Sequence, residues 1–109
     1  MLRRTAPVIP DLVHVGSLEI DRPTRRVAVG GKRIDLPAKE YELLLKLASE
    51  PRRVFTKEEL LRDVWGFRSI GKTRTLDSHA SRLRRKLARG GGGPFVVNVW
   101  GVGYRLLED

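Results

Sequence analysis

With 109 residues the chain has room for one domain, and its formal net charge of +9 indicates an acidic partner, either nucleic acid or an anionic membrane surface. The lack of cysteine excludes a disulfide framework, thiolate catalysis and cysteine-ligated zinc, and the two histidines lie far apart in sequence. No apolar run approaches the roughly 20 residues that span a bilayer, and none has the place of a signal peptide, so we expect a soluble cytoplasmic protein without membrane contact.

The first third of the chain predicts a tail followed by a small sheet. Residues 1–12 are polar and basic, with Pro7 and Pro10 and no hydrophobic periodicity, so we expect a linker or N-terminal tail. Turn signals, including Gly30-Gly31, separate short runs in which apolar and polar residues alternate. The apolar members are Val13, Val15, Leu18, Ile20, Val27, Val29, Ile34 and Leu36. This pattern predicts an antiparallel meander of three or four strands with one covered face.

Two helices are predicted next. Pro37 suits the first turn of a helix because its missing N–H is not needed there, and Pro51 ends that helix. The apolar face of this helix comprises Tyr41, Leu43, Leu44, Leu45, Leu47 and Ala48. Residues 54–55 suit a short extended piece. Residues 56–59 have the form of a capping box, which starts a second helix that ends at Gly66 and carries Leu60, Leu61, Val64 and Trp65.

Residues 72–89 predict a third helix, and its charge pattern is unusual. Leu76, Ala80, Leu83 and Leu87 fall on one stripe at helical spacing, and the opposite face holds Arg74, Ser78, Ser81, Arg82, Arg85 and Arg89. Seven Lys or Arg against the single Asp77 give this segment a charge of +6. An ordinary solvated helix face, which is the alternative, interleaves Glu with its cations. We therefore interpret this face as a contact surface for DNA.

The C-terminal segment predicts a hairpin. Gly90 to Gly93 cannot continue a helix, and we expect a flexible tether there. Residues 95–99 and 104–107 are β-rich runs, and the glycines of Trp100-Gly101-Val102-Gly103 permit a turn between them. The order helix, helix, basic helix, hairpin predicts an α+β winged helix-turn-helix domain over residues 13–109.

From Leu36 onward the chain resembles the OmpR/PhoB-type DNA-binding domain of two-component response regulators. The matching motifs are Glu40-Tyr41-Glu42-Leu43-Leu44, Glu59-Leu60-Leu61, Val64-Trp65-Gly66, Arg74-Thr75-Leu76-Asp77-Ser78-His79, Ser81-Arg82-Leu83-Arg84-Arg85-Lys86-Leu87 and Gly101-Val102-Gly103-Tyr104-Arg105. Residues 13–35 fit the family's N-terminal sheet in size and texture. The resemblance implies an N-terminal antiparallel four-stranded sheet, three helices and a C-terminal β-hairpin wing.

The resemblance also implies how such a domain meets DNA. In the family the third helix enters the major groove, where each base pair is distinguishable, and the wing reaches the neighbouring minor groove. By motif position, base contacts would come from Arg74, Ser78, Ser81 and Arg82. Backbone contacts would come from Lys72, Thr75, His79, Arg84, Arg85 and Arg89, and wing contacts from Asn98, Trp100 and Gly101. The loop that touches RNA polymerase corresponds to Phe67, Arg68 and Ile70, and the alternative for its two apolar residues is packing on the core.

Some positions depart from the family pattern. Trp100 stands where the family usually has a wing arginine, so we expect an indole that avoids full burial and packs on sugar edges or on the protein. Pro37 replaces the usual threonine cap, so we expect Asp35 to cap the first helix. Residues 2–7 resemble the end of a receiver domain, and we expect that receiver to be absent from this chain.

The sequence also allows expectations for four further side chains. We expect Trp65 and Tyr104 to lie in the core. We expect Asp77 to orient Arg74 or a helix end, because phosphates repel a carboxylate. For His79, a phosphate contact and a plain surface position are both open.

The expected function is sequence-specific double-stranded DNA binding for transcription regulation, as the effector domain of a response regulator. The resemblance implies a tandem dimer on direct repeats, with RNA polymerase as a further partner. The alternative is a winged-helix module that binds protein or structured RNA. An enzyme ranks third, because no activated nucleophile, carboxylate pair or phosphate loop is evident, and we expect neither cofactor nor metal.

Overall fold

A four-stranded antiparallel sheet opens the fold. The computed structural model describes residues 11–66, 73–91 and 94–107, so the expected tail lies almost wholly outside the described residues. Neighbouring strands pair in chain order: β1 (Leu12–Val15), β2 (Leu18–Asp21), β3 (Arg26–Val29) and β4 (Lys32–Ile34). Their apolar residues gather on one buried face, as the alternation predicts. Gly30 and Gly31 both adopt the positive φ expected of their hairpin loop.

Three helical segments follow: α1 (Ala38–Ser49), α2 (Lys57–Leu60) with its continuation η1 (Leu61–Trp65), and α3 (Thr73–Ala88). The capping box of α2 is confirmed, because Thr56 Oγ1 accepts from the Glu59 N–H at 3.1 Å and Glu59 Oε1 accepts from the Thr56 N–H at 3.3 Å. Gly66 ends the segment with a left-handed φ of 76°. The π-helical turn η1 was not predicted, because its hydrogen bonds shift by one residue without changing the apolar pattern over so short a stretch.

The start of α1 differs from the expected capping. Pro37 occupies the N-cap position in an extended conformation, and no side chain caps the helix. The Pro37 carbonyl accepts a hydrogen bond from the Tyr41 N–H at 3.0 Å. The prediction that Asp35 caps α1 is wrong, because Asp35 lies two residues before the N-cap, and its carboxylate instead approaches Arg33 Nε at 3.5 Å.

The wing belongs to a second, three-stranded sheet. Its strands are β5 (Phe55–Thr56), β6 (Val97–Val99) and β7 (Gly103–Arg105), in the order β5-β7-β6. At Gly103, an added Cβ would lie 1.9 Å from the Phe55 carbonyl oxygen, so only glycine allows β5 to approach β7 this closely. The hairpin predicted from the sequence is thus anchored by a strand from the segment before α2.

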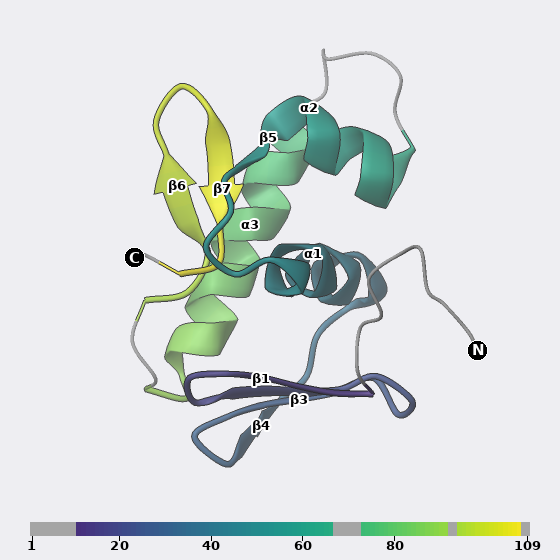
Figure 1. Cartoon of the computed structure of the whole chain (residues 1–109), viewed down its shortest axis with the longest axis vertical. Coiled ribbons are helices and arrows are strands. Elements are labelled where there is room, and N and C mark those ends of the chain that lie inside the picture. The colour runs from purple at the N-terminus through teal and green to yellow at the C-terminus, as the bar shows by residue number, and fades with distance from the viewer. Residues whose placement is uncertain (1–10, 67–72, 92–93, 108–109) are drawn as a thin grey trace, which may run out of the picture.

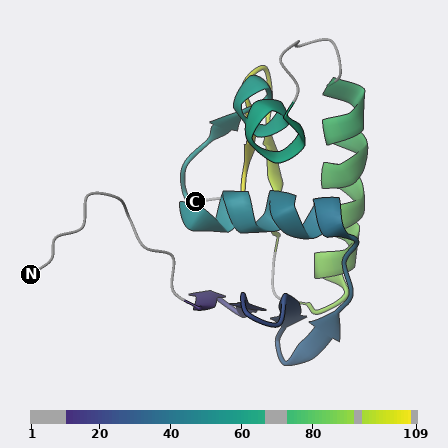
Figure 2. The ribbon, with the colours of Figure 1, turned by 90° about the vertical axis from the view of Figure 1, so that its right-hand side faces the viewer.

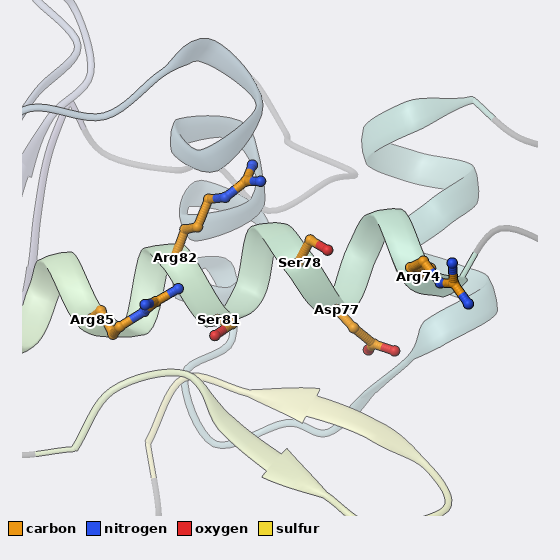
Figure 3. Close-up of a pocket in the computed structure, with 6 residues that line it drawn as sticks. All are labelled: Arg74, Asp77, Ser78, Ser81, Arg82 and Arg85. Carbon is orange, nitrogen blue, oxygen red and sulfur yellow. The ribbon is translucent and has the colours of Figure 1, made fainter.

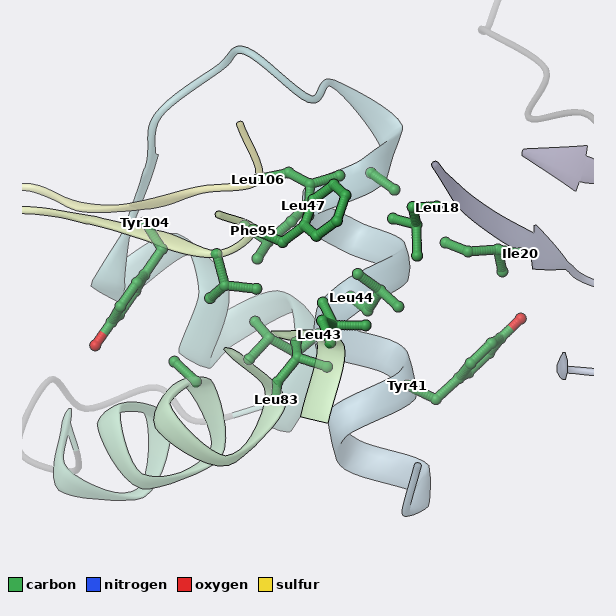
Figure 4. Packing of buried hydrophobic residues seen from close by; sticks show 14 of the residues in the cluster. Leu18, Ile20, Tyr41, Leu43, Leu44, Leu47, Leu83, Phe95, Tyr104 and Leu106 are labelled. Atoms are coloured by element: carbon green, nitrogen blue, oxygen red, sulfur yellow. The ribbon is translucent and has the colours of Figure 1, made fainter. Parts of the chain in front are cut away.

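The core lies where α1, α3, the N-terminal sheet and the base of the wing meet. We call this base, which comprises Phe95, Val96, Tyr104 and Leu106, the wing root. Figures 1 and 2 show α1 between the four-stranded sheet and α2, with α3 running alongside. The α3 stripe of Leu76, Ala80, Leu83 and Leu87 is buried, and Figure 4 shows Leu83 near Leu43 of α1. Tyr104 is buried as expected, and Trp65 packs against the core while only partly buried.

The C-terminal end of α3 packs closely against the N-terminal sheet. At its C-terminal end, a Cβ added to Gly90 would lie 2.4 Å from Val29 Cβ, so this glycine lets the helix end abut β3 rather than serving only as a tether. Gly92 and Gly93 lie outside the described residues.

An ion pair of 3.0 Å between Lys46 and Asp63 joins α1 to η1. The hydrogen bond from Lys46 lowers the pKa of the Asp63 carboxyl.

Candidate nucleic-acid interface

The solvent face of α3 carries the predicted cationic surface. Arg74, Arg82 and Arg85 are exposed, and Ser78 and Ser81 are half-buried between them. With Asp77 they line a shallow hollow of about 530 Å³ along the helix (Figure 3). The structure therefore brings together all four residues assigned to base contact, plus Arg85 from the backbone group. Their common face follows from the helical spacing, since the apolar stripe fixes which side meets the core.

The other α3 residues assigned to the DNA backbone do not line the hollow. His79 Nδ1 lies 2.8 Å from the Thr75 carbonyl oxygen, and its ring meets that of Trp65 edge-on, at 5.1 Å between centroids. Arg84 is exposed and donates to the Val96 carbonyl at 3.4 Å, which turns it toward the wing root. Arg89 is exposed beyond the last turn of α3.

Asp77 links α3 to the wing and to α2. Tyr104 donates its hydroxyl hydrogen to Asp77 Oδ1 at 2.7 Å, and Lys57 Nζ lies 3.2 Å from the same oxygen. The carboxylate of Asp77 binds Tyr104 and Lys57, the first residue of α2, and not Arg74, so the part of the expectation that named Arg74 is wrong. Burial, followed by the hydrogen bond to Asp77, raises the pKa of the Tyr104 phenol above its ordinary range.

The wing tip is exposed and uncharged. Trp100 is 88% exposed, as expected for an indole at a turn, and Val102 is 46% exposed. Gly101 has a φ of 77°, and the Val102 N–H donates to the Val99 carbonyl at 3.0 Å to close the turn. Asn98 is half-buried on β6. An apolar tip therefore stands beside the cationic face of α3.

Comparison with known proteins identifies the domain. Residues 31–106 match the family described as "Transcriptional regulatory protein, C terminal". The DNA-binding domain of the response regulator AdeR, solved in complex with an intercistronic region, is 36% identical, with a TM-score of 0.76 over 85% of this chain and 96% of that one. The chain is an OmpR/PhoB-type winged-helix domain.

Longer proteins contain a similar domain. The Thermotoga maritima OmpR/PhoB homologue DrrB is 34% identical, with a TM-score of 0.74 over 87% of this chain and 43% of DrrB. The Bacillus subtilis transcriptional regulatory protein YclJ is 42% identical over 105 residues, which make up 95% of this chain and 46% of YclJ. The chain thus spans under half of the length of the curated relatives it matches. This family consists of transcription-regulator DNA-binding domains and not of enzymes.

One ion pair that supports the winged-helix interface was missed by the sequence analysis. Glu40 of α1 is buried, and its Oε1 lies 2.9 Å from Lys86 Nζ of α3. A signal was present, because Glu40 falls four and seven residues before Leu44 and Leu47, on the apolar stripe of α1. A carboxylate on such a stripe requires a partner, and the Glu40–Lys86 pair joins α3 to α1.

Part of the predicted site lies outside the described residues. This applies to Lys72 of the backbone group and to the loop residues Phe67, Arg68 and Ile70.

Within the described ranges, no three potential metal ligands of the His or carboxylate type come together. In the same part of the chain, no helix has both the length and the apolar character required to cross a membrane.

Proposed function

We propose that this winged-helix domain binds double-stranded DNA sequence-specifically through α3 and thereby regulates transcription. The observation that carries the proposal is one face of α3 on which the exposed Arg74, Arg82 and Arg85 lie on either side of the half-buried Ser78 and Ser81. An α-helix fits the major groove, where base edges present distinct donors and acceptors. AdeR, whose DNA-binding domain shares this fold, was solved bound to an intercistronic DNA region.

The proposed roles follow from the chemistry of each side chain. Arg74 and Arg82 can bind guanine O6 and N7 with both arms of the guanidinium fork, whereas Ser78 and Ser81 can donate or accept and so discriminate weakly. The proposed phosphate contacts are Lys72, Thr75, His79, Arg84, Arg85 and Arg89. Of these, Arg85 lines the hollow, whereas Arg84 is exposed and donates to the Val96 carbonyl.

Selection of bound sites from a randomised duplex pool tests the proposal. We expect enrichment of one motif, and an affinity for it that exceeds the affinity for random duplex by a factor of about 1,000 or more. Competition with structured RNA and with unrelated duplex separates this function from protein or RNA recognition. Equal affinity for the enriched motif and for random DNA would contradict sequence-specific binding.

Replacing Arg85 with alanine is expected to weaken binding about equally on the enriched motif and on random duplex. The loss of one phosphate contact should lower the slope of log affinity against log salt by about 1. Titrations at several salt concentrations measure this slope. The matched control is Arg33→Ala, which removes an exposed arginine on β4 that does not line the α3 hollow. An Arg85→Ala slope equal to that of the control would remove Arg85 from the interface.

We infer that this domain is part of a longer protein like its relatives, with a receiver domain elsewhere in that protein. We also infer that two copies pair head to tail on direct repeats. The inferred location is the cytoplasm, because the bacterial chromosome lies there. The winged-helix domain itself would span residues 13–109. Duplexes carrying one or two copies of the enriched motif test the pairing, because tandem binding predicts a higher affinity per site when the spacing is correct.

Contact with RNA polymerase is proposed for Phe67, Arg68 and Ile70. Phe67→Ala is expected to reduce activated transcription in a reconstituted assay. DNA affinity should stay unchanged, because Phe67 is not among the proposed DNA contacts. Thermal unfolding provides the control. A melting temperature lowered by many degrees would assign Phe67 to the core instead.

A further inference from the structure

The wing tip carries two of the three large apolar side chains that are exposed in the described residues. Trp100 is 88% exposed and Val102 is 46% exposed, and residues 97–103 contain no charged side chain. The neighbouring surface of α3 is rich in arginine. An uncharged tip beside such a surface cannot add electrostatic affinity for phosphate, so its contribution to binding must come from shape and apolar contact.

The root of the wing is fixed to the recognition helix. Asp77, which lines the α3 hollow, accepts from Tyr104 of β7 at 2.7 Å and pairs with Lys57 of α2 at 3.2 Å. The Lys57 N–H also donates to the Val102 carbonyl at 3.3 Å. The wing is therefore held from both sides, and the position of its tip relative to the arginines is set by this clamp of Asp77, Tyr104 and Lys57.

We propose that Trp100 is an apolar wedge for the minor groove next to the α3 site, and that the clamp of Asp77, Tyr104 and Lys57 positions it. This inference rests on the proposed function, since it needs DNA on the α3 face. The wing adjoins the proposed DNA-binding face, because Asp77 both lines the α3 hollow and accepts a hydrogen bond from Tyr104 of the wing. This supports DNA as the molecule that the wing tip contacts.

The wedge predicts a specific preference in the DNA flanking the motif. Apolar side chains that enter the minor groove unstack base steps partially, and pyrimidine–purine steps such as TA unstack most easily. A narrow A-tract groove attracts cations and gives no such advantage to an indole, which has a single N–H donor. We therefore expect tighter binding when the flank presents TA than when it presents a stiff A-tract.

The test compares duplexes that share the enriched motif and differ only in this flank. Trp100→Ala is expected to weaken binding to the TA duplex about fivefold, the loss of a weak aromatic stacking contact, and to abolish the preference for TA over the A-tract. The matched control, Leu12→Ala, removes an exposed apolar side chain from β1 and should change neither quantity. In the wild-type complex, 2-aminopurine placed at the flanking step should brighten as it unstacks.

The clamp is tested with Tyr104→Phe, which removes only the hydroxyl bound by Asp77. If Tyr104 positions the wedge, this variant should lose the TA preference and the 2-aminopurine signal while α3 still distinguishes the motif from random duplex. Tyr41→Phe, in the other buried tyrosine, controls for the loss of a hydroxyl from the core. A fall in melting temperature with the flank preference intact would leave Tyr104 with a structural role only and overturn its assignment.

The outcomes separate this inference from the proposed function. Loss of all specific DNA binding in wild type would refute both. Specific binding with a normal salt slope, but with a dark 2-aminopurine and no effect of Trp100→Ala, would overturn the wedge alone. Concentration-dependent self-association that Trp100→Ala abolishes, without any flank effect, would show that the tip docks on a second copy and would also overturn the wedge.

Discussion

Replacing Lys86 with methionine is expected to lower the free energy of unfolding by about 3 kcal/mol, because it leaves a buried carboxylate without its partner. Glu40 has a side chain only 3% exposed, and its Oε1 lies 2.9 Å from Lys86 Nζ. For a domain of this size, such a loss corresponds to a fall in Tm of more than about 10 °C. Thermal and denaturant unfolding, monitored by circular dichroism, measure the change.

The double variant Glu40→Leu with Lys86→Met distinguishes a lost ion pair from lost packing. With both charges replaced by apolar groups, the desolvation penalty disappears, and we expect most of the stability to return. Lys32→Met, an exposed lysine on β4, is the control for removing a cation and should change the free energy of unfolding by less than about 0.5 kcal/mol. A single variant as stable as this control would show that the Glu40–Lys86 pair does not anchor α3.

Replacing Arg82 with alanine is expected to cost about 1–3 kcal/mol of binding to the enriched motif and to relax base preference at one or two positions. Arg82 is exposed and lines the α3 hollow, and its guanidinium can make a bidentate contact with guanine. Repeating the selection with the variant reports which positions lose their preference. Arg33→Ala again provides the control, since it removes the same charge from β4.

The loss must be selective to support this role. An arginine that touches only phosphate would weaken the enriched motif and random duplex to the same degree, and the selected motif would be unchanged. That result would move Arg82 from the base contacts to the backbone contacts. It would leave the proposed DNA-binding function of the domain in place.

Local patterns in the sequence predicted much of this fold. The spacing of Leu76, Ala80, Leu83 and Leu87 fixed which face of α3 is buried, because helical periodicity depends only on neighbouring residues. The capping box at Thr56 and Glu59 was likewise confirmed, because both of its partners lie within one turn. The same locality explains why the arginines and serines of the α3 hollow were found together.

Contacts between distant residues could not be predicted in this way. Glu40 and Lys86 are 46 positions apart, and Asp77 and Tyr104 are 27 positions apart, so no periodicity relates them. Asp77 was assigned a local partner for that reason. The close approach that requires glycine at Gly103 depends on where β5 meets β7, and this pairing arises only once the wing packs against the segment before α2.

Amide chemical-shift mapping by NMR shows directly whether the α3 face binds a specific duplex. On titration with the enriched duplex, we expect the largest shifts between Arg74 and Arg85 and at the wing tip, with the four-stranded sheet nearly unchanged. Random duplex at the same concentration and salt should give smaller shifts in fast exchange, as expected for nonspecific contact. Shifts concentrated on the N-terminal sheet, or identical shifts with both duplexes, would contradict the account.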